Sequence, residues 1–177
     1  TFYPEADPGI PVATFLFPLE HRGSFGTALD GASTGPEFMM RTATLENGVH
    51  TASGQDFGFL YDTGSTTTAV TEDLALQLGI DSTVDPPAHS FTVNTVDGRV
   101  VVKGYVVDRF SLVTADGLHE YALDHVLIYV RPDRQNPTRP AFPIGIDVVV
   151  GSNYFAHERG VFNGPASELG LFTANST

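Results

Sequence analysis

The 177-residue sequence contains no cysteine, and its basic residues are scarce. Without cysteine, a disulfide scaffold, a zinc finger and a cysteine nucleophile are excluded. Lys and Arg together number 9 against 21 Asp and Glu, so the formal net charge is −12, and Lys103 is the single lysine. This balance argues against binding to nucleic acid or to an anionic membrane surface, because both attract basic proteins.

Long apolar runs are also missing. The densest run, residues 145–151, is far shorter than the roughly 20 residues that a membrane-spanning helix needs, so we expect no membrane insertion. No basic segment followed by an apolar run lies near Thr1, and no methionine precedes it, so we expect a processed chain or a piece of a longer one. Low lysine, high acid content and no cysteine lead us to expect a secreted or periplasmic protein.

Glycine and proline are frequent, with 18 and 12 residues, while charged residues make up only 17% of the chain. Such a composition is poor in long helices and predicts an all-β domain. The length suits one domain, or one domain with an arm. Prolines and glycines are dense over residues 1–56, which we interpret as an arm that contributes strands; residues 57–173 form the main domain and 174–177 a tail.

Regular strand patterns follow Phe57. Strands are expected at residues 57–61, 66–70, 90–95, 99–107, 110–114, 121–130, 147–150 and 169–172. Asn47-Gly48 and Asp97-Gly98 are typical of hairpin turns. Glu72–Leu78 has helical spacing, with Thr71 as its N-cap and Gly79 as its end. The pattern therefore predicts a closed or nearly closed, mostly antiparallel β-barrel-like fold with one short helix.

The sequence Asp62-Thr63-Gly64-Ser65 directly follows the apolar strand that ends at Tyr61. Burying a carboxylate is costly unless it is hydrogen-bonded or paired. The hydroxyls of Thr63 and Ser65 and the N–H of Gly64 are suited to hold it. Such a site can place one carboxylate beside a second, so that the pair shares a proton, activates a water and protonates a scissile amide. The alternative interpretation is an ordinary turn, since all four residue types favour turns.

Four features in order resemble the retropepsin-like and pepsin-like aspartic peptidases over roughly residues 57–173, which is one lobe of that fold. They are the strand into Asp62-Thr63-Gly64-Ser65 with the strand Thr67–Val70 and the short helix after it, the hairpin 91–107, the strands 110–130, and the run Val148–Phe155. The hairpin stands where the family has its flap. The run Val148–Phe155 looks like the family's motif of two apolar residues, glycine, any residue and Asn or Asp.

The resemblance implies an acid-protease lobe that hydrolyses peptide bonds in peptide or protein substrates without a cofactor or metal. It implies that Asp62 is catalytic, that Thr63, Gly64 and Ser65 form the active-site loop, that Val96, Asp97, Gly98 and Arg99 form the flap over the substrate cleft, and that Gly151 and Asn153 support the site from behind. The charged residues around Gly98 depart from the glycine-rich tips of retroviral flaps.

The chemistry needs two aspartates, and the chain holds one Asp-Thr-Gly. Asp30-Gly31 has no hydroxyl residue between its members and no apolar strand before it, so we interpret it as a turn. The second aspartate must come from an identical subunit in a two-fold dimer or from a preceding lobe. The arm and the Pro-rich segment 131–143 favour the second arrangement, in which this chain is the C-terminal lobe of a bacterial two-lobed secreted protein and residues 1–56 are the inter-lobe segment.

Two other functions stay open: a non-catalytic pepsin-fold binding module that has lost its partner aspartate, and a self-processing lobe. A second Asp-Thr/Ser-Gly in the assembled molecule separates the peptidase from the module. The six histidines show no metal-binding spacing, so no metal site is expected. No Gly-x-Ser-x-Gly sequence surrounds Ser65, which argues against a serine nucleophile. Asp147 is expected to cap its strand or to pair with Arg159.

Overall fold

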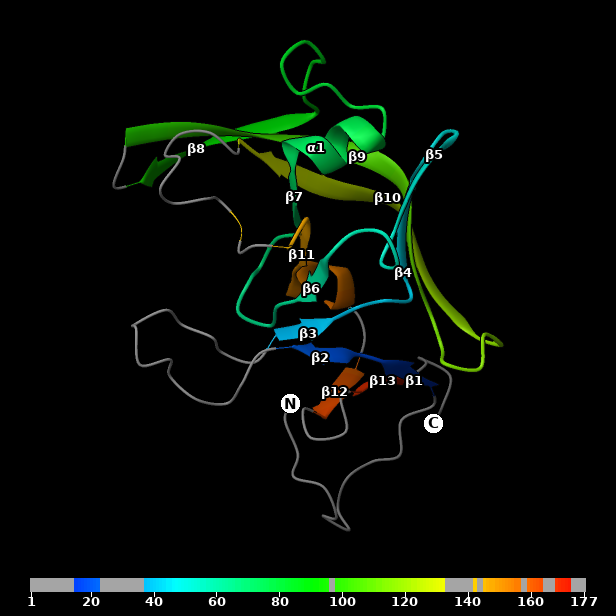
Figure 1. The fold of residues 1–177 in the computed structure, drawn as a ribbon. Helices are drawn as coiled ribbons and strands as arrows, with labels where there is room; N and C mark the ends of the chain where they lie inside the picture. The colour runs from blue at the N-terminus through cyan, green and yellow to red at the C-terminus, as the bar shows by residue number, and fades with distance from the viewer. Residues whose placement is uncertain are drawn as a thin grey trace.

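The computed structural model describes residues 15–22, 37–95, 98–132, 142, 145–156, 159–163 and 168–172. Their strands are β1 (Phe15–Pro18), β2 (Glu20–Arg22), β3 (Glu37–Met39), β4 (Ala43–Asn47), β5 (His50–Ser53), β6 (Phe59–Tyr61), β7 (Ala69–Thr71), β8 (His89–Thr95), β9 (Gly98–Val113), β10 (Glu120–Arg131), β11 (Val148–Val150), β12 (Arg159–Asn163) and β13 (Glu168–Phe172). The helical segments are α1 (Glu72–Gln77) and the 3-10 helix η1 (Ser152–Phe155). Within these ranges the protein is mostly β with one short α-helix (Figure 1).

The strands form two sheets. The large one has the order β2-β3-β6-β11-β7-β10-β9-β4-β5, with β8 also paired to β9, and the small one has the order β1-β13-β12. β6 and β11 run parallel, as do β7 and β10, while the other pairs are antiparallel. The expected closed or nearly closed barrel is therefore wrong, because the sheet is mixed and open, whereas the expected mostly antiparallel pairing is confirmed. Among the described residues β2 pairs only with β3 and β5 only with β4, so the two ends of the sheet do not meet.

The core lies against one face of the large sheet. Along β10 the alternate residues Val126, Ile128 and Val130 are buried, as expected for a strand with one covered face. The largest side chains of this core are almost completely inaccessible to solvent, namely Phe17, Phe59, Phe110, Met40, Leu45, Leu74, Leu78, Leu112, Ile128, Leu169 and Val70. These come from both sheets and from α1, so one core joins the elements around the end of β6.

Short sequence patterns correctly predicted α1 and the β4–β5 hairpin. The Thr71 hydroxyl accepts a hydrogen bond from the N–H of Leu74 at 3.2 Å, which caps the helix as predicted. Gly79 follows the helix with a φ of 75°, a conformation that glycine adopts without strain. Gly48, with a φ of 59°, forms the predicted turn between β4 and β5. The β8–β9 hairpin is present too, although Val96 and Asp97 lie outside the described residues.

Two expected boundaries were wrong. The strand expected at 66–70 begins only at Ala69, because the residues before it form the loop after Asp62. The strands expected at 99–107 and 110–114 are one strand, β9, of 16 residues. Arg109, which lies between the two expected strands, belongs to the ladder: it pairs with Asp124 of β10, and its guanidinium donates to Glu120 at 2.7 Å.

Much of the arm and most of the Pro-rich segment 131–143 lie outside the described residues, as do Asp30-Gly31 and the tail. The boundary of the main domain at residue 57 stays a prediction. Strands β1 to β5 precede that boundary, and β4 pairs with β9 over residues 43–46 and 109–112. In the part of the chain that the structure describes, the helices are too short and too polar to cross a membrane.

Candidate active site

Asp62 lies at the end of β6, in the centre of the large sheet. Its backbone N–H donates to the carbonyl of Val150 at 3.1 Å, which extends the parallel pairing of β6 with β11 by one residue. The side chain is half-buried, and its Oδ1 accepts the N–H of Gly64 at 2.9 Å. The carboxylate is therefore fixed at the end of a buried strand pair, with one oxygen bound by the backbone of its own loop.

Gly64 lets the loop fold back onto this carboxylate. A Cβ at this position would lie 3.2 Å from Asp62 Oδ1, closer than nearly all real contacts of a Cβ atom. The loop is closed by a hydrogen bond from the N–H of Ser65 to the carbonyl of Asp62 at 3.3 Å. Thr63 is exposed at the turn. The glycine of the predicted loop thus allows the backbone to come close to the Asp62 carboxylate.

Ser65 joins the loop to the segment after β11. Its carbonyl accepts the N–H of Ser152 at 2.8 Å and the Ser152 hydroxyl at 3.1 Å. Its own hydroxyl donates to the carbonyl of Thr67 at 2.7 Å. Ser65 therefore has a structural part in holding the loop.

Gly151 and Asn153 meet the loop through Thr68. The Thr68 hydroxyl accepts the N–H of Gly151 at 3.1 Å and donates to Asn153 Oδ1 at 3.0 Å. A Cβ at Gly151 would clash with the carbonyl of Thr67, so only glycine permits this approach. Thr68 is fully buried, and the sequence reasoning missed it. Its position in a run of three threonines between the loop and a buried strand was the available signal.

Asp147 holds the other end of the β6–β11 pair. Its Oδ2 accepts the N–H of Gly58 at 2.8 Å, and its own N–H donates to the Gly58 carbonyl at 2.8 Å. This confirms that Asp147 caps its strand; the side chain of Arg159 lies outside the described residues. The two strands that position Asp62 are thus fixed at both ends.

Aromatic side chains pack behind the site. Tyr61 contacts Phe155 edge-to-face with ring centroids 5.8 Å apart, and Phe155 stacks on Tyr121 at 5.5 Å. The Tyr121 hydroxyl donates to the carbonyl of Tyr154 at 2.7 Å, and the Tyr154 hydroxyl donates to that of Leu127 at 3.0 Å. Burial raises the pKa of Tyr61 and of Tyr154. Tyr61 is therefore a packed strand residue, as predicted, and the layer behind Asp62 is well filled.

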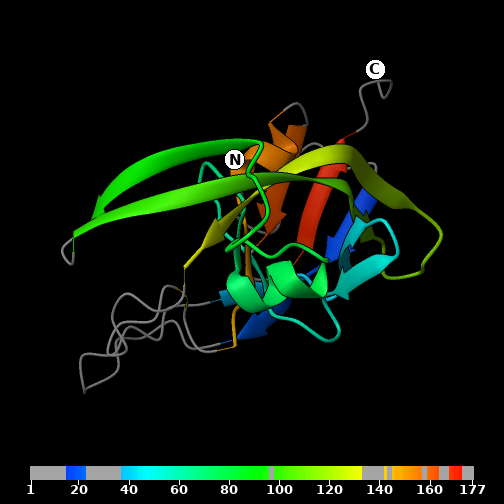
Figure 2. The same cartoon turned by 90° about the horizontal axis from the view of Figure 1, so that it is seen from above.

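The β8–β9 hairpin carries apolar side chains along one face. Phe91 pairs with Val102, and Val93 with Val100; Phe91 and Val93 keep 38% and 37% of their surface exposed. Phe91 also meets Tyr129 of β10 edge-to-face at 5.0 Å. Figure 2 shows the hairpin extending well beyond α1. This face is apolar, and Phe91 and Val93 are its accessible side chains, whereas Val102 is buried.

Two of the predicted flap residues, Gly98 and Arg99, lie at the start of β9, at the end of the described part of this hairpin. Val96 and Asp97 are outside the described residues. Gly98 has a φ of 122°, which fits the turn glycine that the sequence predicted, and Arg99 is exposed beside it. The structure thus brings Asp62, Gly64 and Ser65 together with residues 151–153, while Gly98 and Arg99 lie at the far end of the hairpin.

The described residues contain no group of three His, Cys, Asp or Glu side chains that could hold a metal ion. Asp62 belongs to the one Asp-Thr-Gly of the sequence. What the arrangement offers chemically is a single carboxylate, held by its own backbone loop.

A family model for aspartyl proteases matches residues 48–151, more than half of the chain. A similar solved structure is the retropepsin-like aspartic protease from Rickettsia conorii, with 13% identity, a TM-score of 0.48 and coverage of 87% of this chain and 90% of that one. Another is edgp, with 13% identity, a TM-score of 0.48 and coverage of 93% and 47%, so this chain spans about half of its length. No curated protein matches the chain. On the extent of the family match, the chain belongs to the aspartyl protease family.

Proposed function

We propose that the chain is one half of an aspartic endopeptidase, in which Asp62 supplies one of the two catalytic carboxylates. One observation carries this proposal: the Asp62 carboxylate stands at the end of the β6–β11 pair, bound by the N–H of Gly64 in a loop tied to Ser152. Membership of the aspartyl protease family supports it. The apolar face of the β8–β9 hairpin suits an extended peptide as substrate.

In the proposed reaction the two carboxylates share one proton. The ionised carboxylate takes a proton from a water, whose oxygen adds to the scissile carbonyl carbon, while the protonated carboxyl donates to the carbonyl oxygen. The tetrahedral intermediate collapses when one carboxyl of the pair donates a proton to the amide nitrogen and the C–N bond breaks, so that the nitrogen leaves as an amine. One of the two hydroxyls on the carbon returns its proton to the other carboxylate, which restores the shared proton. The Gly64 N–H keeps Asp62 in one orientation throughout, so the pair need not reorganise.

The second aspartate comes from an identical subunit or from a preceding lobe. The preceding lobe is the arrangement that the sequence favours, in a secreted or periplasmic bacterial protein. The net charge of −12 opposes self-association at neutral pH and does so less in acid, where carboxylates are neutralised. We therefore propose that a monomer of this chain is inactive by itself.

The test combines a peptidase assay on a denatured protein with sedimentation of the same sample across pH. Turnover that appears only with the associated species and is lost in Asp62→Asn supports the half-site. Asp56→Asn is the matched control, because Asp56 is exposed and hydrogen-bonded only to Ser53 within the described contacts. Turnover by a strictly monomeric species contradicts the half-site. A folded, associated protein without turnover, even after addition of a preceding lobe, favours the non-catalytic binding module.

A further inference from the structure

β9 is paired on one edge by β10 and on the other by two different strands. On this second edge β8 pairs with residues 98–104 and β4 with residues 109–112. Within the described structure, residues 105–108 have no strand partner there. The hydrogen bond from the N–H of Ala88 to the carbonyl of Gly104, at 2.9 Å, is the last one before the gap.

The backbone of Val106 faces this gap. Successive residues of a strand direct their N–H and C=O groups to opposite edges, so residues two apart share an edge. Because the Gly104 carbonyl bonds to Ala88, the N–H and C=O of Val106 lie on the same open edge. At about 3.3 Å per residue, the gap is roughly 13 Å long. Open strand edges of this kind accept another extended chain.

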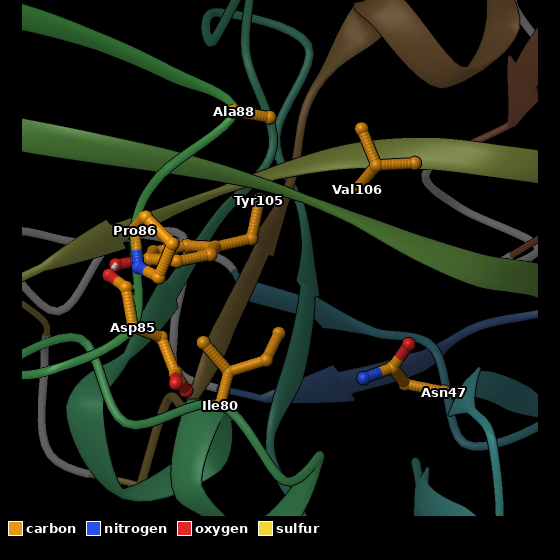
Figure 3. Close-up of a pocket in the computed structure, with 7 residues that line it drawn as sticks. All are labelled: Asn47, Ile80, Asp85, Pro86, Ala88, Tyr105 and Val106. Atoms are coloured by element: carbon orange, nitrogen blue, oxygen red, sulfur yellow. Dashed lines mark hydrogen bonds between the residues drawn. The ribbon is translucent and has the colours of Figure 1, made fainter.

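A cavity of about 380 Å³ adjoins the gap, within the size range of ligand sites. Its lining comes from the end of β4, the segment after α1 and β9 (Figure 3): Asn47, Ile80, Asp85, Pro86, Ala88, Tyr105 and Val106. Ile80 and Tyr105 are 7% and 6% exposed and supply apolar surface. The Tyr105 hydroxyl donates to the carbonyl of Asp85 at 3.0 Å, which holds the segment against β9.

The surroundings of the cavity are acidic. Asp85 lines it, and Asp85 Oδ2 accepts the N–H of the neighbouring Asp81 at 2.7 Å. Burial, and after it the negative charges of Asp85 and Asp81, raise the pKa of the Tyr105 hydroxyl. At the other end Asp108 accepts the N–H of Gly48 at 2.6 Å.

Two cations lie near this acidic region. The Lys103 ammonium donates to the carbonyl of Ser82 at 2.5 Å and lowers the pKa of Asp81 by its charge, after the hydrogen bonds from Thr83. Arg109 is paired with Glu120 across β10. Among the described residues no ion pair includes Asp85, so its carboxylate at the cavity favours a cationic ligand.

We propose that the cavity and the open edge of β9 bind an extended segment of a partner polypeptide, which adds as a short strand between β4 and β8. A lysine or arginine of that segment lies with its aliphatic stem on Ile80 and Tyr105 and its charged end at Asp85. The backbone of the segment pairs with Val106. A second copy of this chain is a poor occupant, because its net charge is also −12.

The probe is the capped peptide Ser-Val-Arg-Val-Ser, added to the whole chain carrying Asp62→Asn, so that the readout does not depend on peptidase activity. Amide hydrogen exchange is measured residue by residue. The peptide should protect the N–H of Val106, while that of Val107, which faces β10, is the internal control. Two further peptides are methylated on every second amide nitrogen, one on the odd-numbered and the other on the even-numbered residues. Only one of them should lose binding, because only one set of amides faces β9.

Variants of the cavity test separately the charge of Asp85 and the space that the peptide side chain occupies. Asp85→Asn should weaken binding of the peptide by about tenfold, the loss of one charge-assisted hydrogen bond. Asp116→Asn, which makes the same charge change in the turn between β9 and β10, should leave it unchanged. Ala88→Trp fills the cavity from an exposed position and should abolish binding, whereas Leu118→Trp adds the same ring to a remote surface.

Three results would overturn the proposal. One is unchanged exchange at Val106 in the presence of saturating peptide. Another is equal affinity for Ser-Val-Glu-Val-Ser, since the acidic cavity should reject it. The third is protection of the Val106 N–H that increases with protein concentration in the absence of peptide. A second copy of the chain would then be the occupant.

Discussion

The hydroxyl of Thr68 accepts a hydrogen bond from the N–H of Gly151 at 3.1 Å and joins the segment before β7 to the segment after β11. The same hydroxyl donates to Asn153 Oδ1, so one fully buried oxygen serves two partners that lie 83 and 85 residues away in the chain. The loop that holds Asp62 is therefore supported by a residue of the strand predicted after it, which was not among the predicted site residues.

Thr68→Val keeps the shape of this side chain and removes both hydrogen bonds. The N–H of Gly151 is then buried without a partner, which should lower the free energy of unfolding by about 1–3 kcal/mol. Chemical denaturation measures this loss, and Thr68→Ser is the control that keeps the hydroxyl. Equal stability of the valine and serine variants would contradict the assigned contact.

Gly64 and Gly151 should respond differently to alanine. At Gly151 the new Cβ meets the backbone carbonyl of Thr67, so Gly151→Ala should destabilise the fold by about 1–3 kcal/mol. At Gly64 it meets the Asp62 carboxylate at 3.2 Å, in an exposed turn, so Gly64→Ala should lower kcat with little change in melting temperature. A large loss of stability in Gly64→Ala would show that this glycine serves folding and not the site.

Peptidase activity of the assembled protein should be highest in acid. The proposed mechanism needs one proton on the pair of carboxylates, so activity falls as pH rises and the pair loses that proton. The profile of kcat/KM against pH measures this for the associated species. Activity that instead increases towards alkaline pH would exclude a shared-proton pair.

The pair of Glu20 and Arg41 should contribute to stability in a pH-dependent way. The hydrogen bonds from Arg41, at 2.8 and 3.0 Å, hold the pKa of Glu20 below its ordinary value. The contribution is therefore complete above the unfolded pKa and is lost as pH falls through the folded pKa. Both side chains are a third or more exposed, so Glu20→Gln should cost at most about 1 kcal/mol at neutral pH. Thermal unfolding of both proteins should converge in acid; a constant difference would contradict the assignment.

Signals within a few residues were read correctly from the sequence. The cap of α1 at Thr71 and the turn at Gly48 depend on local backbone conformation, and each has a characteristic residue type. The loop of Asp62 was predicted in the same way, from a carboxylate followed by a glycine. Such features are fixed by neighbours in the chain, so a single sequence contains them.

The features that the sequence did not predict depend on contacts between residues far apart in the chain. The two parallel strand pairs and the open sheet follow from how crossovers place β6, β7 and β11, which no local pattern indicates. The continuity of β9 through Arg109 requires Glu120 across the ladder. Thr68 is recognisable only when Gly151 and Asn153 lie against it. The sequence therefore predicted that the Asp62 loop lies against residues 151–153, but it did not identify Thr68, which joins them.

The gap at residues 105–108 determines how the β8–β9 hairpin can move. Residues 103–104 and 109–112 of β9 have strand neighbours on both edges, whereas at residues 105–108 β10 is the only strand neighbour that the described structure provides. Bending is easiest where the fewest interstrand hydrogen bonds resist it. We therefore expect the β8–β9 hairpin to bend relative to β4 and β5 at these four residues, while the two strands of the hairpin stay paired with each other.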